Sequence, residues 1–320
     1  MKLISRFFGI LFSALIAGTA SAQPYPNKVV RIISGYEVGG GATVGLHLFA
    51  EEMGNQLNTK FIVDSRPGAS FSIAARAVRN AAPDGYTVYA GGIGSDPLLY
   101  KNGMRVIGEL KPVSMVTEIP LVFFTNTAKG LKSMAAVVAY AKEKPDKLNF
   151  ASIGGSVYLN LMMSVLASRL GGFSYVNIPY KGAPQAQMAL ISGEVDITLI
   201  SIRSGQAGLD SGRITPILVG AVKRSPLLPH VPSLEEVGLQ NIAVDSKVGL
   251  WAPPGTPAAI INMLSDAAQA IVKNPAYNEK FTNVLGASPL GTTPEGMERR
   301  FEQEFRLMQE GVRLSNYEPR

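Results

Sequence analysis

The sequence predicts an α/β fold with two domains, each a mostly parallel sheet flanked by helices. Three observations lead to this prediction: strand-like runs alternate with helix-like runs, glycine-rich stretches follow the strand-like runs, and the alternation starts again in the second half of the chain. Alternation with short connections is typical of parallel sheets that helices cover on both faces. The restart indicates a second α/β unit, with a cleft between the two.

The first unit is predicted from residue 28 onward. Its elements, in chain order, are a strand at 29–33, a helix at 44–57, a strand at 61–63, a helix at 73–81 and a strand at 86–90. Three glycines, Gly39 to Gly41, follow the first strand, and Gly68 and Gly92 follow the next two. Because ligands bind at the carboxyl ends of strands in open α/β sheets, these loops predict a ligand site at one rim.

The second unit repeats this pattern, and two helices follow it in the tail. Its predicted strands and helices are, in chain order, 148–151, 157–170, 175–178, 186–191 and 195–200. In the tail, Thr256-Pro257 and Thr293-Pro294 each predict an N-cap threonine followed by a first-turn proline. Apolar side chains recur every three or four positions of the last helix, at Met297, Phe301, Phe305, Met308 and Val312. This stripe predicts a helix face packed in the core.

The first 22 residues have the pattern of a secretory signal peptide. Lys2 and Arg6 precede an apolar block at 7–17, and the small residues at 20–22 form a cleavage pattern. The apolar block is shorter than the roughly 20 residues that span a bilayer. We therefore predict export and cleavage after Ala22.

Composition excludes several kinds of function. The 320-residue chain carries a formal net charge of +6 and contains no cysteine. Without cysteine there can be no disulfide, thiolate metal site or cysteine nucleophile. The basic residues are scattered, with Lys223-Arg224 and Arg299-Arg300 as the only adjacent pairs, so we predict no nucleic-acid partner. The length exceeds what one core usually organises, which agrees with two domains.

The stretch SGYEVGGGATVGL, at 34–46, lacks the residues of a nucleotide motif. A phosphate loop requires a lysine directly after its glycines, where Ala42 stands. The dinucleotide fingerprint G-x-G-x-x-G requires a glycine where Val44 stands, although Asp64 lies at about the right distance for a ribose-binding acid. A dinucleotide enzyme therefore stays an alternative.

The physical properties of this turn suit another anion. Consecutive glycines leave bare backbone N–H groups, and the helix that follows adds its first unpaired N–H groups and its positive dipole end. A carboxylate fits such a place as well as a phosphate. One helix dipole contributes up to about 2 kcal/mol, whereas micromolar affinity requires about 8 kcal/mol. Several loops must therefore converge on one buried ligand.

The sequence shows no catalytic or metal-binding pattern. His47 and His230 are isolated, without the spacing of metal ligands, and we interpret both as structural. Ser156 lies in GGSVY, which lacks the second glycine of a nucleophile elbow. This serine is either a hydrogen-bond donor to a ligand or a helix N-cap, and the two roles are compatible. We predict no catalytic residue, no metal and no cofactor.

Eight blocks of the chain resemble a known family. These blocks are VVRIISGYEVGGGATVGL, DSRPGAS, AAPDGYTVYAGG, KLNFASIGGS, NIPYKGAP, SGEVDIT, KRSPLLPHVPSLEEVGL and GLWAPPGTPAAI. In their order and spacing they resemble the Bug-type periplasmic receptors of tripartite tricarboxylate transporters. The resemblance implies a two-domain periplasmic-binding-protein (Venus-flytrap) fold that binds a small carboxylate and delivers it to a membrane permease. It also implies two chain crossings, with domain 1 at 23–122 and 246–320 and domain 2 at 123–245. We expect a periplasmic monomer.

The same resemblance implies which residues bind the ligand. They come from loops of both domains and are Tyr36, Gly40, Gly41, Ala42, Thr43, Ser70, Phe71, Ser72, Gly94, Ser95, Ser152, Gly155, Ser156, Tyr158, Tyr180 and Lys247. Arg66 and Lys181 are left out of this set, because each could equally be an exposed charge on a structural turn.

The first ligand loop departs from the family pattern P-P-G-G-G-T-D. Glu37 and Val38 stand before the glycines, and Thr43 takes the place of the aspartate. If this loop contacts the ligand, the replacement Thr43→Asp should weaken anion binding through charge repulsion.

Further departures lie elsewhere in the predicted site. Ser70 and Phe71 replace two glycines, Tyr158 replaces a common histidine, and Lys247 stands where an aromatic residue is usual. Losing an acid and gaining a lysine should make the cleft more positive, and the two rings add stacking surface. We therefore expect a preference for an anion with an apolar or aromatic portion. A ligand sensor for a membrane signalling protein and an exported enzyme on the same scaffold stay alternatives.

Overall fold

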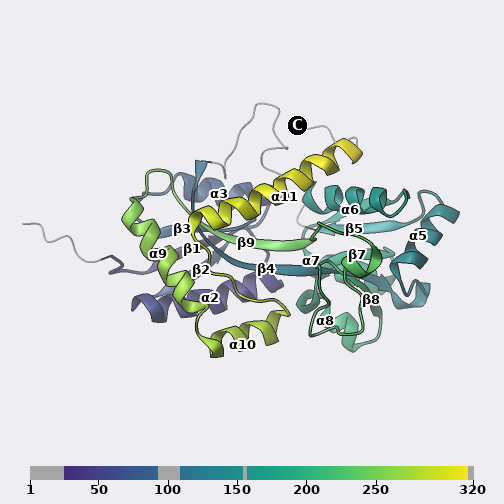
Figure 1. Ribbon diagram of the computed structural model, residues 1–320, viewed down its shortest axis with the longest axis horizontal. Coiled ribbons are helices and arrows are strands. Elements are labelled where there is room, and N and C mark those ends of the chain that lie inside the picture. The colour runs from purple at the N-terminus through teal and green to yellow at the C-terminus, as the bar shows by residue number, and fades with distance from the viewer. Residues whose placement is uncertain (1–24, 93–108, 154–156, 316–320) are drawn as a thin grey trace, which may run out of the picture.

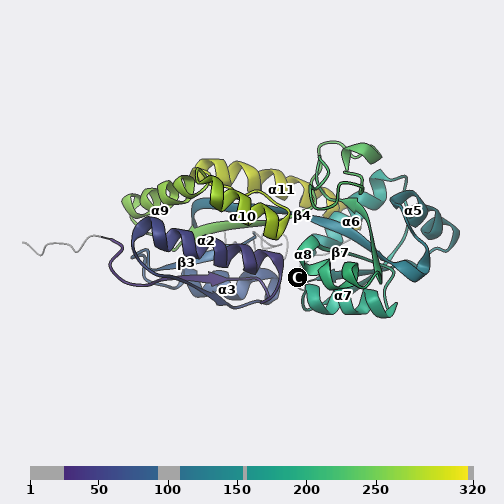
Figure 2. The same ribbon diagram turned by 90° about the horizontal axis from the view of Figure 1, so that it is seen from below.

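The computed structural model describes residues 25–92, 109–153 and 157–315, so the predicted leader lies outside the described residues. Figures 1 and 2 show two lobes side by side. Lobe 1 contains the elements of residues 30–91 and 258–285, and lobe 2 contains those of residues 127–237. The lobes are linked by strands β4 (Lys111–Asn126) and β9 (Asp245–Ala252) and by helix α11 (Pro294–Ser315). None of the described helices is long and apolar enough to cross a membrane.

Lobe 1 is a sheet with helices on both faces. Its elements are β1 (Val30–Ser34), α2 (Gly41–Leu57), β2 (Phe61–Ser65), the 3-10 turn η1 (Ala69–Phe71), α3 (Ser72–Arg79), β3 (Thr87–Gly91), α9 (Ala258–Ile271) and α10 (Pro275–Leu285). Strand β1 pairs in parallel with β2 on one side and β3 on the other. One apolar core lies between the sheet and α2, α9 and α10, and a second lies on the face that α3 covers.

Lobe 2 has the same layered construction. Its elements are η3 (Thr127–Lys129), α5 (Met134–Glu143), β5 (Asn149–Ile153), α6 (Val157–Arg169), β6 (Val176–Tyr180), α7 (Ala183–Ser192), β7 (Ile197–Ser201), α8 (Ile202–Asp210), β8 (Ile214–Val219) and η4 (Glu235–Val237). Strand β5 pairs in parallel with both β6 and β7. Helices α5 and α6 cover one face and α7 and α8 cover the other, each over its own apolar core.

Two strands join the lobes into one sheet of order β2-β1-β3-β9-β4-β7-β5-β6, with β8 also paired to β4. β4 (Lys111–Asn126) pairs antiparallel with β9 (Asp245–Ala252) as far as Pro120, and from Leu121 onward it pairs with β7 and β8. Gly220 lies beside this change of partner, where a Cβ atom would lie 2.3 Å from the Val244 carbonyl oxygen. Only a glycine fits this close backbone approach.

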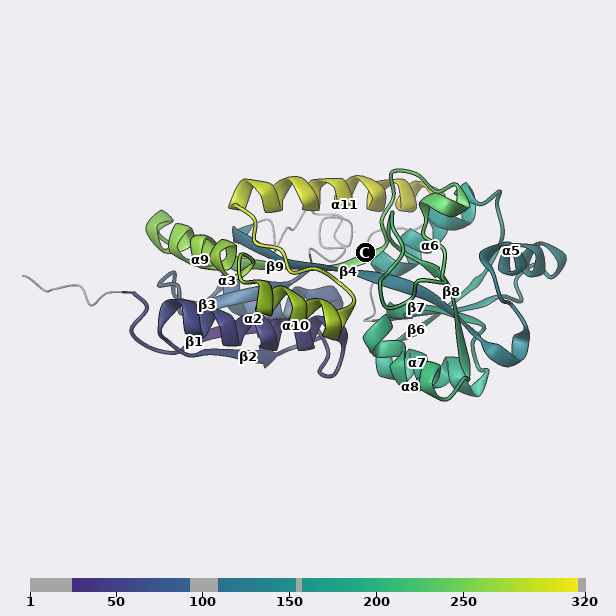
Figure 3. The same cartoon turned by 60° about the horizontal axis from the view of Figure 1, so that its bottom comes forward.

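Helix α11 (Pro294–Ser315) runs along both lobes, as Figures 1 and 3 show. Met297 and Phe301 pack with Trp251 in lobe 1, whereas Met308 packs in the core beside α6 of lobe 2. Arg169 of α6 forms an ion pair with Glu310 at 2.8 Å. The predicted packing of the apolar stripe is confirmed for these three side chains, and the helix connects the lobes through them.

The predicted α/β class is confirmed, and most predicted elements lie where expected. Thr293 caps α11, since its Oγ1 accepts a hydrogen bond from the Gly296 N–H at 3.2 Å. The predicted cap at Thr256 is wrong, because its hydroxyl donates instead to the Pro253 carbonyl at 2.9 Å and Pro257 precedes the helix. The main difference for the site is that α2 begins at Gly41, three residues earlier than predicted.

Candidate ligand-binding site

A pocket of about 590 Å³ lies between the two lobes. This volume suits a small organic ligand. Lobe 1 lines it with the loops that follow β1, β2 and β3, namely Gly35, Tyr36, Glu37, Gly40, Gly41, Ala42, Pro67, Gly68, Ala69, Phe71 and Gly92. Lobe 2 and the linking elements supply Ile119, Leu121, Ile153, Tyr158, Leu159, Pro179, Tyr180, Lys181, Gly182, Ala183, Pro184, Ser201, Ser204, Asp245, Ser246, Lys247 and Glu304.

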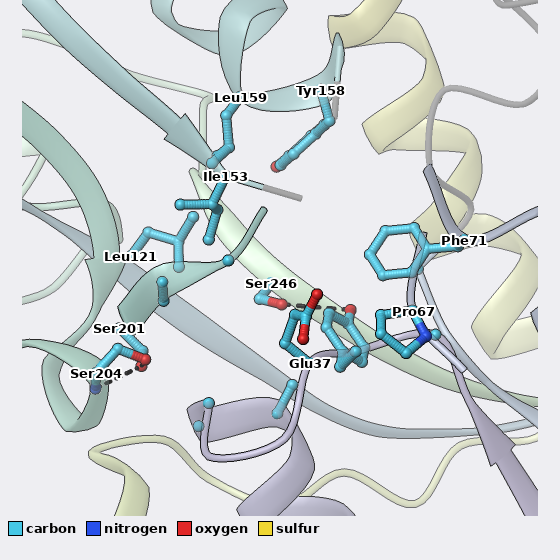
Figure 4. A pocket seen from close by; sticks show the side chains of 18 of the residues that line it. Glu37, Pro67, Phe71, Leu121, Ile153, Tyr158, Leu159, Ser201, Ser204 and Ser246 are labelled. Carbon is cyan, nitrogen blue, oxygen red and sulfur yellow. Dashed lines mark hydrogen bonds between the residues drawn. The ribbon is translucent and has the colours of Figure 1, made fainter. Parts of the chain in front are cut away.

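Apolar side chains form two facing walls of the pocket. In Figure 4, Phe71 and Pro67 lie on one side, with Ile153, Leu121 and Leu159 opposite them. The Phe71 ring meets the Tyr36 ring edge to face, with centroids 4.9 Å apart. The space between the walls therefore suits a ligand with an apolar portion.

The N-terminus of α2 opens onto this pocket without a side-chain cap. Gly40 is the N-cap residue, it has extended backbone angles, and the first turn contains no acidic residue. Gly40 and Gly41 line the pocket, so bare N–H groups of the first turn are available to an anion. The side chain of Thr43 is buried and donates to the Glu37 carbonyl at 2.6 Å, which shapes the loop.

Two tyrosines hold the start of β9 from opposite lobes. The Tyr36 hydroxyl donates to the Lys247 carbonyl at 2.7 Å, and the Tyr158 hydroxyl donates to the Asp245 carbonyl at 3.2 Å. The Ser246 hydroxyl lies 3.3 Å from the Tyr36 hydroxyl, a contact drawn in Figure 4. Burial raises the pKa of both tyrosines, so both rings are neutral phenols.

A buried charge cluster lies beside these tyrosines. Lys247 Nζ is 2.5 Å from Asp245 Oδ1 and 3.8 Å from Glu304 Oε2. Burial raises the pKa of Glu304 to about 8, with Asp245 and Glu118 acting in the same direction and Lys247 opposing them. Burial alone would lower the pKa of Lys247, but the three carboxyl groups around it outweigh burial and raise it. The expectation that Lys247 makes the cleft more positive is wrong, because the Asp245 carboxylate balances its charge.

The lobes approach each other closely at two glycines. A Cβ atom added to Gly41 would lie 2.9 Å from the Ser201 Oγ of lobe 2. One added to Gly182 would lie 2.9 Å from Cγ of Glu37 in lobe 1. Ser201 is itself held in place, because its Oγ accepts the Ser204 N–H at 3.1 Å as the cap of α8. These contacts bring the first loop of lobe 1 against lobe 2.

The predicted site residues fall into three groups. Those that line the pocket are Tyr36, Gly40, Gly41, Ala42, Phe71, Tyr158, Tyr180 and Lys247. Thr43, Ser72 and Ser152 are buried beside it but are not among the lining residues. The side chain of Ser70 and all of Gly94, Ser95, Gly155 and Ser156 lie outside the described residues.

Sequence reasoning missed several polar residues of the pocket: Glu37, Ser201, Ser204, Asp245, Ser246 and Glu304. Of the two basic residues left out, Lys181 lines the pocket, whereas Arg66 pairs with Asp64 at 2.8 Å outside it. Both histidines are exposed and lie away from the pocket lining. Within the described ranges there is no group of three or more possible metal ligands.

A two-lobed α/β fold with a pocket between the lobes is the architecture of periplasmic solute-binding proteins. Residues 46–304 match the family model described as "Tripartite tricarboxylate transporter family receptor", so the chain belongs to this family. A UPF0065 protein of Bordetella bronchiseptica is 32% identical over 303 residues, covering 92% of this chain and 89% of that protein.

Solved structures agree with this assignment. The periplasmic binding protein BugD is 27% identical, with a TM-score of 0.80, and the match covers 92% of this chain and all of that one (100%). Rpa4515 of R. palustris, solved with adipate, is 25% identical with a TM-score of 0.84, over 93% of this chain and 100% of that one. The predicted family and the two-domain periplasmic-binding-protein fold are confirmed.

Proposed function

We propose that this protein is an extracytoplasmic receptor that captures a small carboxylate between its two lobes and delivers it to a tripartite tricarboxylate-type permease. The observation that carries the proposal is the pocket between the lobes, onto which the uncapped N-terminus of α2 opens. Membership of the receptor family and the likeness to Rpa4515, solved with adipate, support it.

The ligand is held mainly by lobe 1. Backbone N–H groups at Gly40 to Ala42 bind the carboxylate at the end of α2, where the helix dipole favours an anion. Phe71 and the facing apolar wall then cover an apolar portion of the same molecule. The preferred ligand is therefore an organic acid with an aliphatic or aromatic body.

Capture proceeds by closure of the lobes about the strands that join them. We assign domain 1 to 23–122 and 246–320 and domain 2 to 123–245, and the change of β4 partners between Pro120 and Leu121 supports this division. The contact of Gly41 with Ser201 belongs to the closed form. Ligand binding favours that form, and the permease distinguishes it from the open one.

The protein acts in the periplasm as a monomeric binding protein without catalytic activity. The leader pattern at 1–22 directs export, with cleavage after Ala22. The permease recognises the loaded receptor. The predicted ligand roles of Thr43, Ser72 and Ser152 stay predictions, as do those of the residues outside the described ranges.

Titration calorimetry with a panel of acids tests the proposal. The mature chain is titrated with adipate, an aromatic monocarboxylate, malate and citrate, after unfolding and refolding to remove carried-over ligand. We expect at least micromolar binding of an acid with an apolar body and much weaker binding of citrate. Exclusive binding of citrate would contradict the ligand preference, and binding of none would contradict the receptor function. Turnover of a bound acid, followed by NMR, would instead indicate an enzyme.

A further inference from the structure

Glu304 places a buried carboxyl group at the pocket. Glu304 is 7% exposed and lines the pocket. Its Oε2 atom has no hydrogen-bond partner among the described residues. Packing forces it there, because Phe301 and Met308, three and four residues away on α11, are buried on the same helix face. A buried polar atom without a partner is costly and is usually explained by a ligand or by water.

The neighbouring cation is already engaged. Lys247 Nζ lies 3.8 Å from Glu304 Oε2 but 2.5 Å from Asp245 Oδ1. Glu118 of β4 also acts on Glu304, and it is paired with Arg300 at 2.8 Å. An ionised Glu304 would therefore be a second buried negative charge beside one lysine. Burial, with Asp245 and Glu118, outweighs Lys247 and raises the pKa of Glu304 to about 8.

The two tyrosines that face the cluster do not change this balance. Tyr36 and Tyr158 are neutral. Their hydroxyl groups donate hydrogen bonds to the backbone carbonyls of Lys247 and Asp245, respectively. At neutral pH Glu304 is thus a carboxylic acid that keeps one O–H donor, and among the described residues no acceptor takes it.

From this geometry we infer that Glu304 is a specificity-determining residue that donates a hydrogen bond from its neutral carboxyl group to an oxygen of the bound acid. The inference rests on the proposed function and deepens it. The ligand keeps its negative charge, Glu304 keeps its proton, and capture is coupled to the protonation of this one side chain.

The affinity for the acid should fall as the pH rises. An anion beside Glu304 favours its neutral form, so the pKa of Glu304 is higher in the complex than in the free protein. Affinity should be constant below about pH 8. Above that pH it should fall by up to about tenfold per pH unit, with the uptake of close to one proton for each ligand bound. A ligand with an ammonium group at this place would show the opposite trend.

Calorimetry between pH 6.5 and 9.5 tests this, in two buffers of different ionisation enthalpy, with the panel acid that binds most tightly. Glu304→Gln keeps a donor that does not titrate, so its affinity at pH 7 should stay within a few-fold of wild type and should not change with pH. Glu304→Leu removes the donor and should bind about tenfold more weakly or worse at pH 7, roughly the effect of one lost hydrogen bond to a charged group. Glu298→Gln, an exposed position of the same helix, should follow wild type.

The possible outcomes separate the role of Glu304 from the receptor function. If wild type binds the acid with the same affinity throughout and takes up no proton, or if Glu304→Gln keeps the wild-type pH dependence, the role of Glu304 is overturned while the receptor function stands. If no acid of the panel binds wild type at any pH, the proposed function fails and this inference fails with it. Circular dichroism of each variant shows that a weak binder is still folded.

Discussion

Lys247 Nζ lies 2.5 Å from Asp245 Oδ1, and both side chains are at least nine-tenths buried. The two residues are separated by one position in β9, so both side chains point to the same side of the strand. The pair lines the pocket at the start of β9, one of the two strands that join the lobes. Lys247, which resemblance to the family indicated as a ligand-binding residue, is therefore also the buried ion-pair partner of an aspartate.

Removing the lysine alone should destabilise the protein. In Lys247→Met the Asp245 carboxylate stays buried without its partner, and breaking a buried pair in this way costs roughly 3–5 kcal/mol. The double variant Asp245→Asn with Lys247→Met should regain most of that loss, because neither charge then remains. Urea unfolding at pH 7 measures both changes. A single variant as stable as wild type would contradict the burial of an uncompensated charge.

Glu304 should make stability depend on pH in a predictable direction. Its pKa is raised from 4.5 to about 8 in the folded protein, so between these values the folded state holds a proton that the unfolded chain releases. Its stabilising effect is complete below pH 4.5 and is lost as the pH rises toward 8. The stability of Glu304→Gln relative to wild type should therefore increase by roughly 4 kcal/mol over this range. Urea unfolding at several pH values measures the difference.

The control is Glu298→Gln, because Glu298 is exposed on the same helix. Its unfolding free energy should run parallel to that of wild type at every pH. If Glu304→Gln also runs parallel to wild type, Glu304 has no raised pKa in the folded protein.

Local sequence patterns predict the three strands of lobe 1 but not the two strands that join the lobes. The predicted strands at 29–33, 61–63 and 86–90 agree closely with β1, β2 and β3, because each is a short apolar run that ends near glycine or proline. β4 and β9 were not predicted. β4 contains Pro112 and Pro120, which disrupt the strand pattern, and its role depends on pairing with β9, more than a hundred residues away.

The residues of the candidate site likewise comprise some that local patterns predict and some that these patterns do not. Residues in strand-end loops, such as Tyr36 and Phe71, were found because the loop pattern itself indicates a ligand rim. Glu304 was missed because tertiary packing alone brings α11 to the pocket. Ser201 directly follows the predicted strand at 195–200, so the strand-end pattern could have found it. One signal was available: Glu304 interrupts the buried row of Met297, Phe301 and Met308, and a charged residue on a core-facing stripe is uncommon.

Gly41 should be required for closure of the lobes. The methyl group of Gly41→Ala would lie 2.9 Å from Ser201 Oγ, and overpacking of this kind typically costs about 1–3 kcal/mol. We expect ligand affinity to fall about fivefold or more. The rescue is Gly41→Ala with Ser201→Gly, which clears the contact and costs only a few tenths of a kcal/mol at the cap of α8. Calorimetry measures both, and failure of the rescue would indicate that the methyl group blocks the ligand itself.

Phe71 should contribute ligand affinity at the expense of stability. Its φ of 75° lies in the left-handed region, which is unfavourable for a bulky residue, while its ring packs on Tyr36 and faces the pocket. Phe71→Gly relieves backbone strain of roughly 1–2 kcal/mol but loses an aromatic contact of about 0.5–1.5 kcal/mol, so stability should change little.

In Phe71→Gly, binding of an acid with an apolar body should weaken about tenfold, since full burial of a phenylalanine side chain is worth about 1.5–3 kcal/mol. A small polar acid should be affected far less. Calorimetry with both ligands measures this contrast. The control is Ile73→Ala, at an exposed position of α3. Equal losses of affinity for both acids would mean that Phe71 shapes the loop rather than contacting the ligand.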